Sequence, residues 1–328
     1  MPAFLQNLNT FGNALPSAVS QGLIWGIMAI GLYITYKLLE LSDLTVDGSF
    51  CTGGAVCAAM MVAGHSVWTA ILVAFLAGIA AGAVTGFLHT KCKIPAILSG
   101  ILTQLALWTV NMAIMGAQNK DLVSMLSLPS RAYELLVSLS FLETVPAGMK
   151  PVYYHPILTM GVFTLAIIGI LYWFFGTERG ASIRATGANE HMARAQGINT
   201  DINKLLGLML ANGLVALSGS LFAQYQGSAE INMGRGAIVI GLAAIIIGDV
   251  LFGKLFKNFG LKLLAVSLGS IIYFVVIQAV LSLLDVDSRY LKLFSAIIVA
   301  IFLTVPNLKG NHPKKHHQDK KEVPACSK

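Results

Sequence analysis

Residues 66–90, SVWTAILVAFLAGIAAGAVTGFLHT, contain no aspartate, glutamate, lysine or arginine. An uncharged apolar run of about 20 residues or more predicts a helix that crosses a lipid bilayer. Gly78, Gly82 and Gly86 recur at intervals of four, with Ala74 one turn earlier, so small residues share one face of this helix. We expect that face to pack closely against another helix, either in the same chain or in a neighbouring subunit.

The rest of the chain has the same apolar character. Of the 328 residues, 56% are hydrophobic and 11% are charged, and the mean hydropathy is +0.74. Charged residues make up about 25% of an average soluble domain, so this composition excludes a water-soluble enzyme. It also excludes a disordered chain, which needs low hydrophobicity and a high net charge. The composition therefore predicts an all-α, polytopic membrane protein.

Eight or nine segments are apolar enough to be transmembrane helices. We expect them near residues 17–36, 46–63, 66–90, 94–116, 152–176, 204–226, 235–252, 260–284 and 289–306. They form one transmembrane domain (17–308), after an extracytoplasmic N-terminus (1–16) and before a disordered basic tail (309–328). The external loop 117–151 contains an amphipathic stretch, Tyr133–Leu142, which we expect to lie along the membrane surface.

The net charge of +7 indicates the orientation of these helices rather than a nucleic-acid partner. The basic residues stand at the ends of apolar runs and in the tail, and cytoplasmic loops of membrane proteins are enriched in lysine and arginine. Placing segment 177–203 and the tail in the cytoplasm puts 16 of the 22 lysines and arginines there. The N-terminus is then outside.

The sequence shows no catalytic or metal-binding arrangement. Residues 248–255 resemble a phosphate-binding loop, but Leu255 stands where a hydroxyl must bind magnesium. We therefore expect no ATP hydrolysis by this chain itself. The cysteines lack metal-binding spacing and are expected to be structural or neutral thiols: Cys51, Cys57, Cys92 and Cys326.

Polar residues within the apolar segments have two possible uses. Asp43 and Asp47 precede the glycines at 53–54, so either carboxylate can cap the start of a short, broken second helix. Alternatively they line a translocation path, because irregular backbone at membrane depth is tolerated mainly beside a cavity. Asn111 and Asn212 are the amides expected deepest in the membrane, where they either bond across helices or line the same path.

The segment 177–203 is the longest polar stretch apart from the tail. It is too long and too patterned for a simple connection. We expect a short helix between glycines, exposed on the cytoplasmic side, to which another protein can bind.

Two motifs give the chain a family resemblance. The first is Thr177-x-x-Gly-x-x-x-Arg-Ala-x-Gly-x-Asn189, followed by Ala195-x-Gly-Ile198. The second is Asp-Leu-Thr-Val-Asp-Gly-Ser-Phe at 43–50. Together they resemble the type II permease subunits of bacterial ABC importers, in the branch that serves branched-chain amino acids and ribose. The resemblance runs from about Gln21 to Pro306 and is greatest to a subgroup that carries amino acids, including aromatic ones.

The resemblance implies the assembly and its working parts. Members of this family work in the bacterial cytoplasmic membrane as two permeases, here expected to be a homodimer, with two ATPases and an external substrate-binding lipoprotein. ATP is then bound by the partner, and the permease needs no cofactor. The loop 177–203 becomes a coupling helix that seats in the ATPase. The residues expected to carry the coupling are Arg184, Gly187, Asn189 and Gly197.

Each coupling residue has an expected task. Arg184 would pair with an acidic or carbonyl acceptor, Asn189 would cap a helix, and the glycines would permit tight turns. The small-residue face Gly78–Gly86 would be available for packing in the assembly. The substrate path is expected at Asp43, Asp47, Asn111 and Asn212.

Two other classes remain open from the sequence. An ATP-independent secondary transporter or channel would show intramembrane acid–base chains or paired broken helices, and only one candidate for a broken helix is found, near 43–54. A non-transporting membrane scaffold would use the polar segment 177–203 to bind something other than an ATPase.

Overall fold

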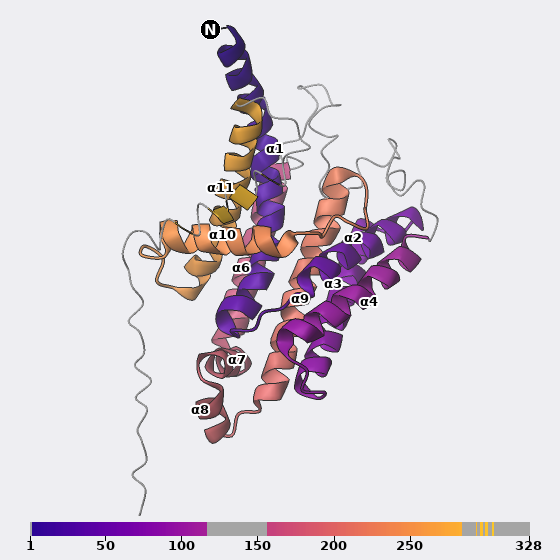
Figure 1. Ribbon diagram of the computed structural model, residues 1–328, viewed down its shortest axis with the longest axis vertical. Coiled ribbons are helices and arrows are strands. Elements are labelled where there is room, and N and C mark those ends of the chain that lie inside the picture. The colour runs from indigo at the N-terminus through magenta and orange to yellow at the C-terminus, as the bar shows by residue number, and fades with distance from the viewer. Residues whose placement is uncertain are drawn as a thin grey trace, which may run out of the picture.

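The computed structural model describes residues 2–116 and 156–283, together with six helical positions between 293 and 304. All regular structure in this part of the chain is helical (Figure 1). The helices are α1 (Pro2–Tyr33), η1 (Ile34–Leu38, a π-helical turn), α2 (Val46–Val62), α3 (Val67–Thr90), α4 (Ala96–Ile114), α6 (Pro156–Gly176), α7 (Glu178–Ala188), α8 (Glu190–Ala195), α9 (Thr200–Gln226), α10 (Ala237–Phe252) and α11 (Phe259–Leu283).

Six of the described segments are long and apolar enough to cross a membrane, which confirms the prediction of an all-helical, polytopic protein. They are Phe11–Leu38, Val67–Thr90, Ala96–Ile114, Ile157–Gly176, Thr200–Gln226 and Phe259–Ser282. The helices expected at 46–63 and 235–252 are present as α2 and α10, but with 17 and 16 residues they are shorter than these six. At ~1.5 Å per residue each measures about 25 Å, less than the ~30 Å of bilayer hydrocarbon.

Three predictions concern segments that the structure describes only in part or not at all. The last expected span, 289–306, is described only at isolated helical positions. The amphipathic stretch Tyr133–Leu142 and the basic tail 309–328 lie outside the described residues.

The first helix begins earlier than expected. We predicted a span from residue 17, whereas α1 starts at Pro2 and continues through Pro16 without a break. Its apolar, membrane-length part begins at Phe11. The proline removes one backbone donor, and the Ser20 hydroxyl donates to the Pro16 carbonyl oxygen at 2.9 Å. Residues 2–16 are thus part of the first helix. Their moderate hydropathy gave no signal of a membrane helix.

The predicted break in the second helix is wrong. Helix α2 runs unbroken from Val46 to Val62, with both glycines inside it. A Cβ at Gly53 would overlap the backbone carbonyl of Ala216 on α9, so the glycine permits a close helix crossing instead of ending the helix. The irregular backbone lies ahead of α2, at 39–45, where Glu40 has a positive φ of 54°.

Helix α9 lies at the centre of one half of the molecule, and α1, α2 and α3 pack against it. The small-residue face of α3 is used here: added Cβ atoms at Gly78 and Gly82 would overlap the backbone carbonyls of Asn212 and Leu208. The expectation that this face is free for assembly with other subunits is therefore wrong, because α9 of the same chain already covers it.

In the other half, α1 packs along α11, and α10 lies across both in the view of Figure 1. Helices α7 and α8 lie together at one end of the molecule, below α6 and beside the start of α9. We call this the α7–α8 end.

Candidate functional site

Asp43, Ser49 and Asn212 form a buried polar group that we call the closed cluster. The Asn212 side-chain nitrogen donates to an Asp43 carboxylate oxygen at 2.7 Å, and the Ser49 hydroxyl donates to the Asn212 amide oxygen at 2.7 Å. The other Asp43 oxygen accepts the backbone amide of Thr45 at 2.9 Å. Asp43 and Asn212 are 4% and 0% exposed. Their polar atoms are thus paired with one another and with the backbone.

Asp43 does not cap α2 as predicted, because its carboxylate accepts none of the first amides of that helix. Thr45 is the N-cap residue of α2, but its side chain makes no capping hydrogen bond. The Asp43 carboxylate accepts a hydrogen bond from the Thr45 backbone amide. The Thr45 hydroxyl instead pairs with that of Thr85 on α3 at 2.8 Å. The stretch before α2 is therefore tied to α3 and α9.

Asp47 caps a different helix from the one expected. It lies in the first turn of α2, but its carboxylate oxygens accept the amides of Gly236 and Ile238, each at 3.1 Å. These amides begin α10, whose N-cap Gly236 offers no side chain. An anion is stabilised at that position because the first amides of a helix point outward and carry partial positive charge.

A cavity of about 250 Å³, which we call the α2–α4 cavity, lies beside Asp47. Its lining is Asp47, Gly48, Cys51, Gln104, Leu105, Trp108, Asn111, Ile231 and Arg235. Asn111 is 1% exposed and donates weakly to the Gly48 carbonyl at 3.4 Å, while its amide oxygen has no hydrogen-bond partner among the described residues. A buried unpaired acceptor costs about 1–3 kcal/mol, so this oxygen is available to a ligand.

The structure thus separates the four residues predicted for the substrate path. Asp43 and Asn212 belong to the closed cluster, and Asp47 and Asn111 line a cavity. Trp108 and Arg235 also line it, although the sequence had not suggested either for the path. A signal was present, since Gln104, Trp108 and Asn111 recur at the spacing of one helix face.

The polar segment 177–203 contains two short helices instead of the single one predicted. Thr177 caps α7 by accepting the Gly180 amide at 3.4 Å, and Asn189 caps α8 by accepting the Met192 amide at 3.0 Å. The capping task predicted for Asn189 is confirmed. Gly197 turns the chain after α8 with a φ of +79°.

Gly187 does not form a turn, because it lies inside α7. It allows the backbone of α7 to approach the end of η1 closely. A Cβ there would overlap the carbonyl oxygen of Leu38, at the end of η1. The Asn203 side chain also donates to the Thr186 hydroxyl at 2.9 Å. Helix α7 is thereby held against both the end of the first span and the start of α9.

Ionic contacts fix α8 to α9. Glu190 pairs with Arg194 and with Lys204, in both cases at 2.8 Å. The hydrogen bond from Lys204 lowers the pKa of Glu190 below its ordinary value of 4.5, and the charges of Lys204 and Arg194 act in the same direction. The Glu190–Lys204 pair thus connects α8 to the first turns of α9.

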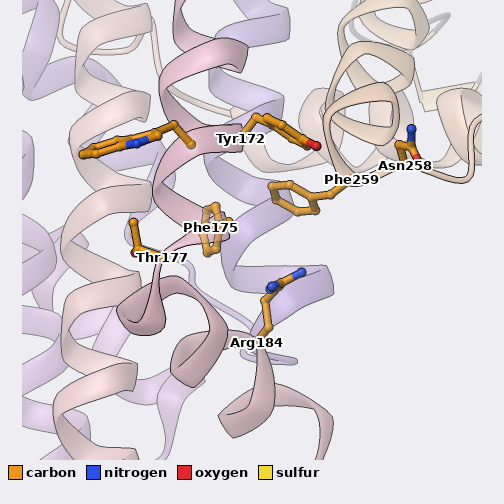
Figure 2. Close-up of a pocket in the computed structure, with 8 residues that line it drawn as sticks. Tyr172, Phe175, Thr177, Arg184, Asn258 and Phe259 are labelled. Atoms are coloured by element: carbon orange, nitrogen blue, oxygen red, sulfur yellow. The ribbon is translucent and has the colours of Figure 1, made fainter.

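Arg184 has no ion pair among the residues that the structure describes, so no acidic partner for it is found within them. It faces a second cavity, of about 490 Å³, at the junction of α6, α7 and the start of α11 (Figure 2). The lining is Tyr172, Trp173, Phe175, Gly176, Thr177, Arg184, Asn258 and Phe259. We call this the α6–α7 cavity.

The stretch that resembles a phosphate-binding loop is the end of a helix. Residues 248–252 close α10, and a turn follows from Gly253. A phosphate-binding loop follows a strand and opens a helix, which is the opposite arrangement.

Comparison with known proteins gives the family. A family described as the branched-chain amino acid transport system permease component matches residues 15–305. The tyrosine transport system permease protein of Clostridioides difficile is 40% identical over 293 residues, 89% of this chain and 91% of that protein. An uncharacterized protein of Rickettsia prowazekii, RP368, is 32% identical over 89% of this chain and 97% of its own length.

A sugar permease is similar over a comparable length. The ribose import permease protein RbsC of Escherichia coli K12 is 26% identical over 306 residues, 90% of this chain and 86% of that protein. These matches cover nearly all of the membrane domain. The chain belongs to the branched-chain amino acid transport system permease family and is the permease subunit of an ABC importer, not its ATPase.

Proposed function

We propose that this permease imports an aromatic amino acid. The observation that carries the proposal is the 40% identity to a tyrosine transport system permease over 89% of the chain. The 26% identity to the ribose permease over a similar length makes a sugar the weaker choice. As in the resembled family, an external binding lipoprotein delivers the solute and cytoplasmic ATPases supply the energy.

The proposed orientation places the α7–α8 end in the cytoplasm of a bacterial cell and the N-terminus outside. The positive-inside rule supports it, since 16 of the 22 lysines and arginines then fall on the cytoplasmic side. A second copy of the chain completes the permease as a homodimer.

The proposed solute path passes through the α2–α4 cavity. A free amino acid carries an ammonium, a carboxylate and, in this class, an aromatic ring. The unpaired Asn111 oxygen suits the ammonium, the Arg235 guanidinium suits the carboxylate and the Trp108 ring suits aromatic stacking. The closed cluster around Asp43 and Asn212 has no such free groups, and its part is to hold α2 against α9.

The proposed coupling element is the α7–α8 pair. Asn189 and Gly197 shape it, Gly187 seats it against η1, and the Glu190–Lys204 pair ties it to α9. Movement of the ATPases is then passed to the central helix α9. Arg184 lies on the same element, on the side that faces the α6–α7 cavity.

The test is ATP-dependent uptake by the complex purified with its ATPase and binding protein and placed in liposomes. We expect uptake of tyrosine, tryptophan or phenylalanine, with no uptake of leucine or ribose. Uptake of ribose alone would refute the aromatic substrate. Equal uptake without ATP or the ATPase would refute the coupling scheme and indicate a secondary transporter.

A further inference from the structure

The α6–α7 cavity opens at the boundary of the membrane. Tyr172 and Trp173 lie in the last turn of the span Ile157–Gly176, and they are 58% and 72% exposed. Aromatic side chains at the ends of spans sit at the level of the lipid headgroups, with the ring in the apolar layer and the polar edge in the interface. The rim of this cavity therefore faces lipid.

The opposite wall of the cavity is polar and positively charged. Arg184 extends from α7 toward Phe259 in Figure 2, and Asn258 borders the same space. Phe175 packs edge-on against Phe259 with ring centroids 5.1 Å apart, which closes the cavity on the protein side. Among the described residues, none of those lining the cavity is acidic.

The chain beside the cavity adds to this charge. Residues 253–262, which form the connection after α10 and the first turn of α11, contain Lys254, Lys257 and Lys262 and no acidic residue. All three lysines are exposed. Asp249, the acidic residue that precedes this segment, is already paired with Lys37 at 2.9 Å. Arg184 therefore lies near a basic segment, and no acidic side chain among the described residues forms an ion pair with it.

We propose that the α6–α7 cavity binds the phosphate group of an anionic phospholipid. Arg184 donates to the phosphate oxygens as a planar fork, which is the geometry that guanidinium and phosphate share. Asn258 donates from the position just before α11, and the neighbouring lysines attract the negative headgroup. The rings of Tyr172 and Trp173 lie along the start of the acyl chains.

A lipid fits this cavity better than an acidic side chain of a protein partner does. The rim is formed by residues of a membrane span, so a ligand enters from the headgroup layer. The bound phosphate joins α6, α7 and α11, and so links the proposed coupling element to two spans. The site depends only on these residues and not on which solute is imported.

The experiment measures lipid binding to the full-length protein, delipidated in mild detergent, by native mass spectrometry. The probes are phosphatidylglycerol, zwitterionic phosphatidylethanolamine and inorganic phosphate. We expect one phosphatidylglycerol per chain to bind in preference to phosphatidylethanolamine, and Arg184→Gln to weaken it about tenfold, as loss of a charge-assisted bidentate contact requires. Arg179→Gln is the matched control, because Arg179 is exposed on the same helix but does not line the cavity.

Hydrogen exchange on the unmodified protein gives a reading that does not depend on the variant folding. Phosphatidylglycerol should slow exchange in 178–188 more than phosphatidylethanolamine does. Equal effects of the two lipids, or equal weakening by both variants, would refute the site. Displacement of the lipid by millimolar phosphate would identify a free-phosphate site instead. Unchanged lipid binding by Arg184→Gln, with loss of the ATPase from the complex, would assign Arg184 to a protein partner.

Discussion

The closed cluster and the α2–α4 cavity are built from the same kinds of residue and differ in what remains unpaired. Each combines a carboxylate with an asparagine next to the start of α2. In the closed cluster, Asp43, Ser49 and Asn212 bond to one another. In the cavity, the Asp47 carboxylate is bound by α10, but the Asn111 oxygen has no partner among the described residues. The comparison teaches that an intramembrane polar residue indicates a solute path only when its hydrogen-bonding capacity is left open.

The largest effect on stability is expected from Asn212→Leu. The change removes the donor to Asp43 and the acceptor of Ser49, and leaves a buried carboxylate without its partner on α9. Leaving a buried hydrogen-bonding group without its partner costs about 1–3 kcal/mol, and more when the group is charged. Thermal unfolding in detergent should therefore occur at a clearly lower temperature.

The matched change in the cavity, Asn111→Leu, is the control for this prediction. If both variants lose the same stability, the distinction between the two sites is wrong.

Asp47→Ala should have an intermediate effect, because it removes the acceptor for the first amides of α10. Loss of a helix cap costs about 1–2 kcal/mol. Asp47→Asn keeps one acceptor oxygen and should lose less stability. Equal losses in the two variants, measured by thermal unfolding, would show that the carboxylate does not act as a cap.

Asn111→Leu should reduce uptake while leaving stability within about 1 kcal/mol of the original protein, since among the described residues the side chain has only weak partners, the Gly48 carbonyl at 3.4 Å and the Cys51 thiol. The measurement is the rate of ATP-driven uptake at saturating binding protein, alongside thermal unfolding. Normal uptake by a stable variant would remove Asn111 from the path.

The smallest effect is expected in the exposed ionic contacts of α8. Glu190→Gln should cost about 0.5 kcal/mol, because pairs open to solvent are weak. Since folding lowers the pKa of Glu190, its contribution is full at neutral pH, begins to fall near 4.5 and is lost as the pH drops through the folded-state value. Unfolding measured against pH should show this acid sensitivity reduced in the variant. Glu178→Gln serves as the control.

The sequence predicted the elements of this protein better than their contacts. Hydropathy located every described span within a few residues, except the start of α1, where the moderately polar residues before 17 gave no apolar signal. The cap formed by Asn189, which was expected from the family resemblance, is also present. Local pattern failed where a residue's partner is distant in the chain.

Asp47 illustrates that failure. Its position predicts a cap for α2, but its partners lie nearly two hundred residues away, at Gly236 and Ile238. The glycines at 53–54 likewise suggested a break, because nothing nearby in the sequence shows that α9 crosses there. Nor did composition show that Asn212 is fully paired and Asn111 is not.

The most direct test of the difference between the two sites is thiol accessibility in the assembled importer. In a background without the four native cysteines, Asn111→Cys places a thiol on the cavity wall and Ser49→Cys places one in the closed cluster. We predict that a small water-soluble thiol reagent modifies the first, more slowly when the solute and its binding protein are present, and leaves the second unmodified. Rapid, solute-protected modification at position 49, with none at position 111, would contradict the account.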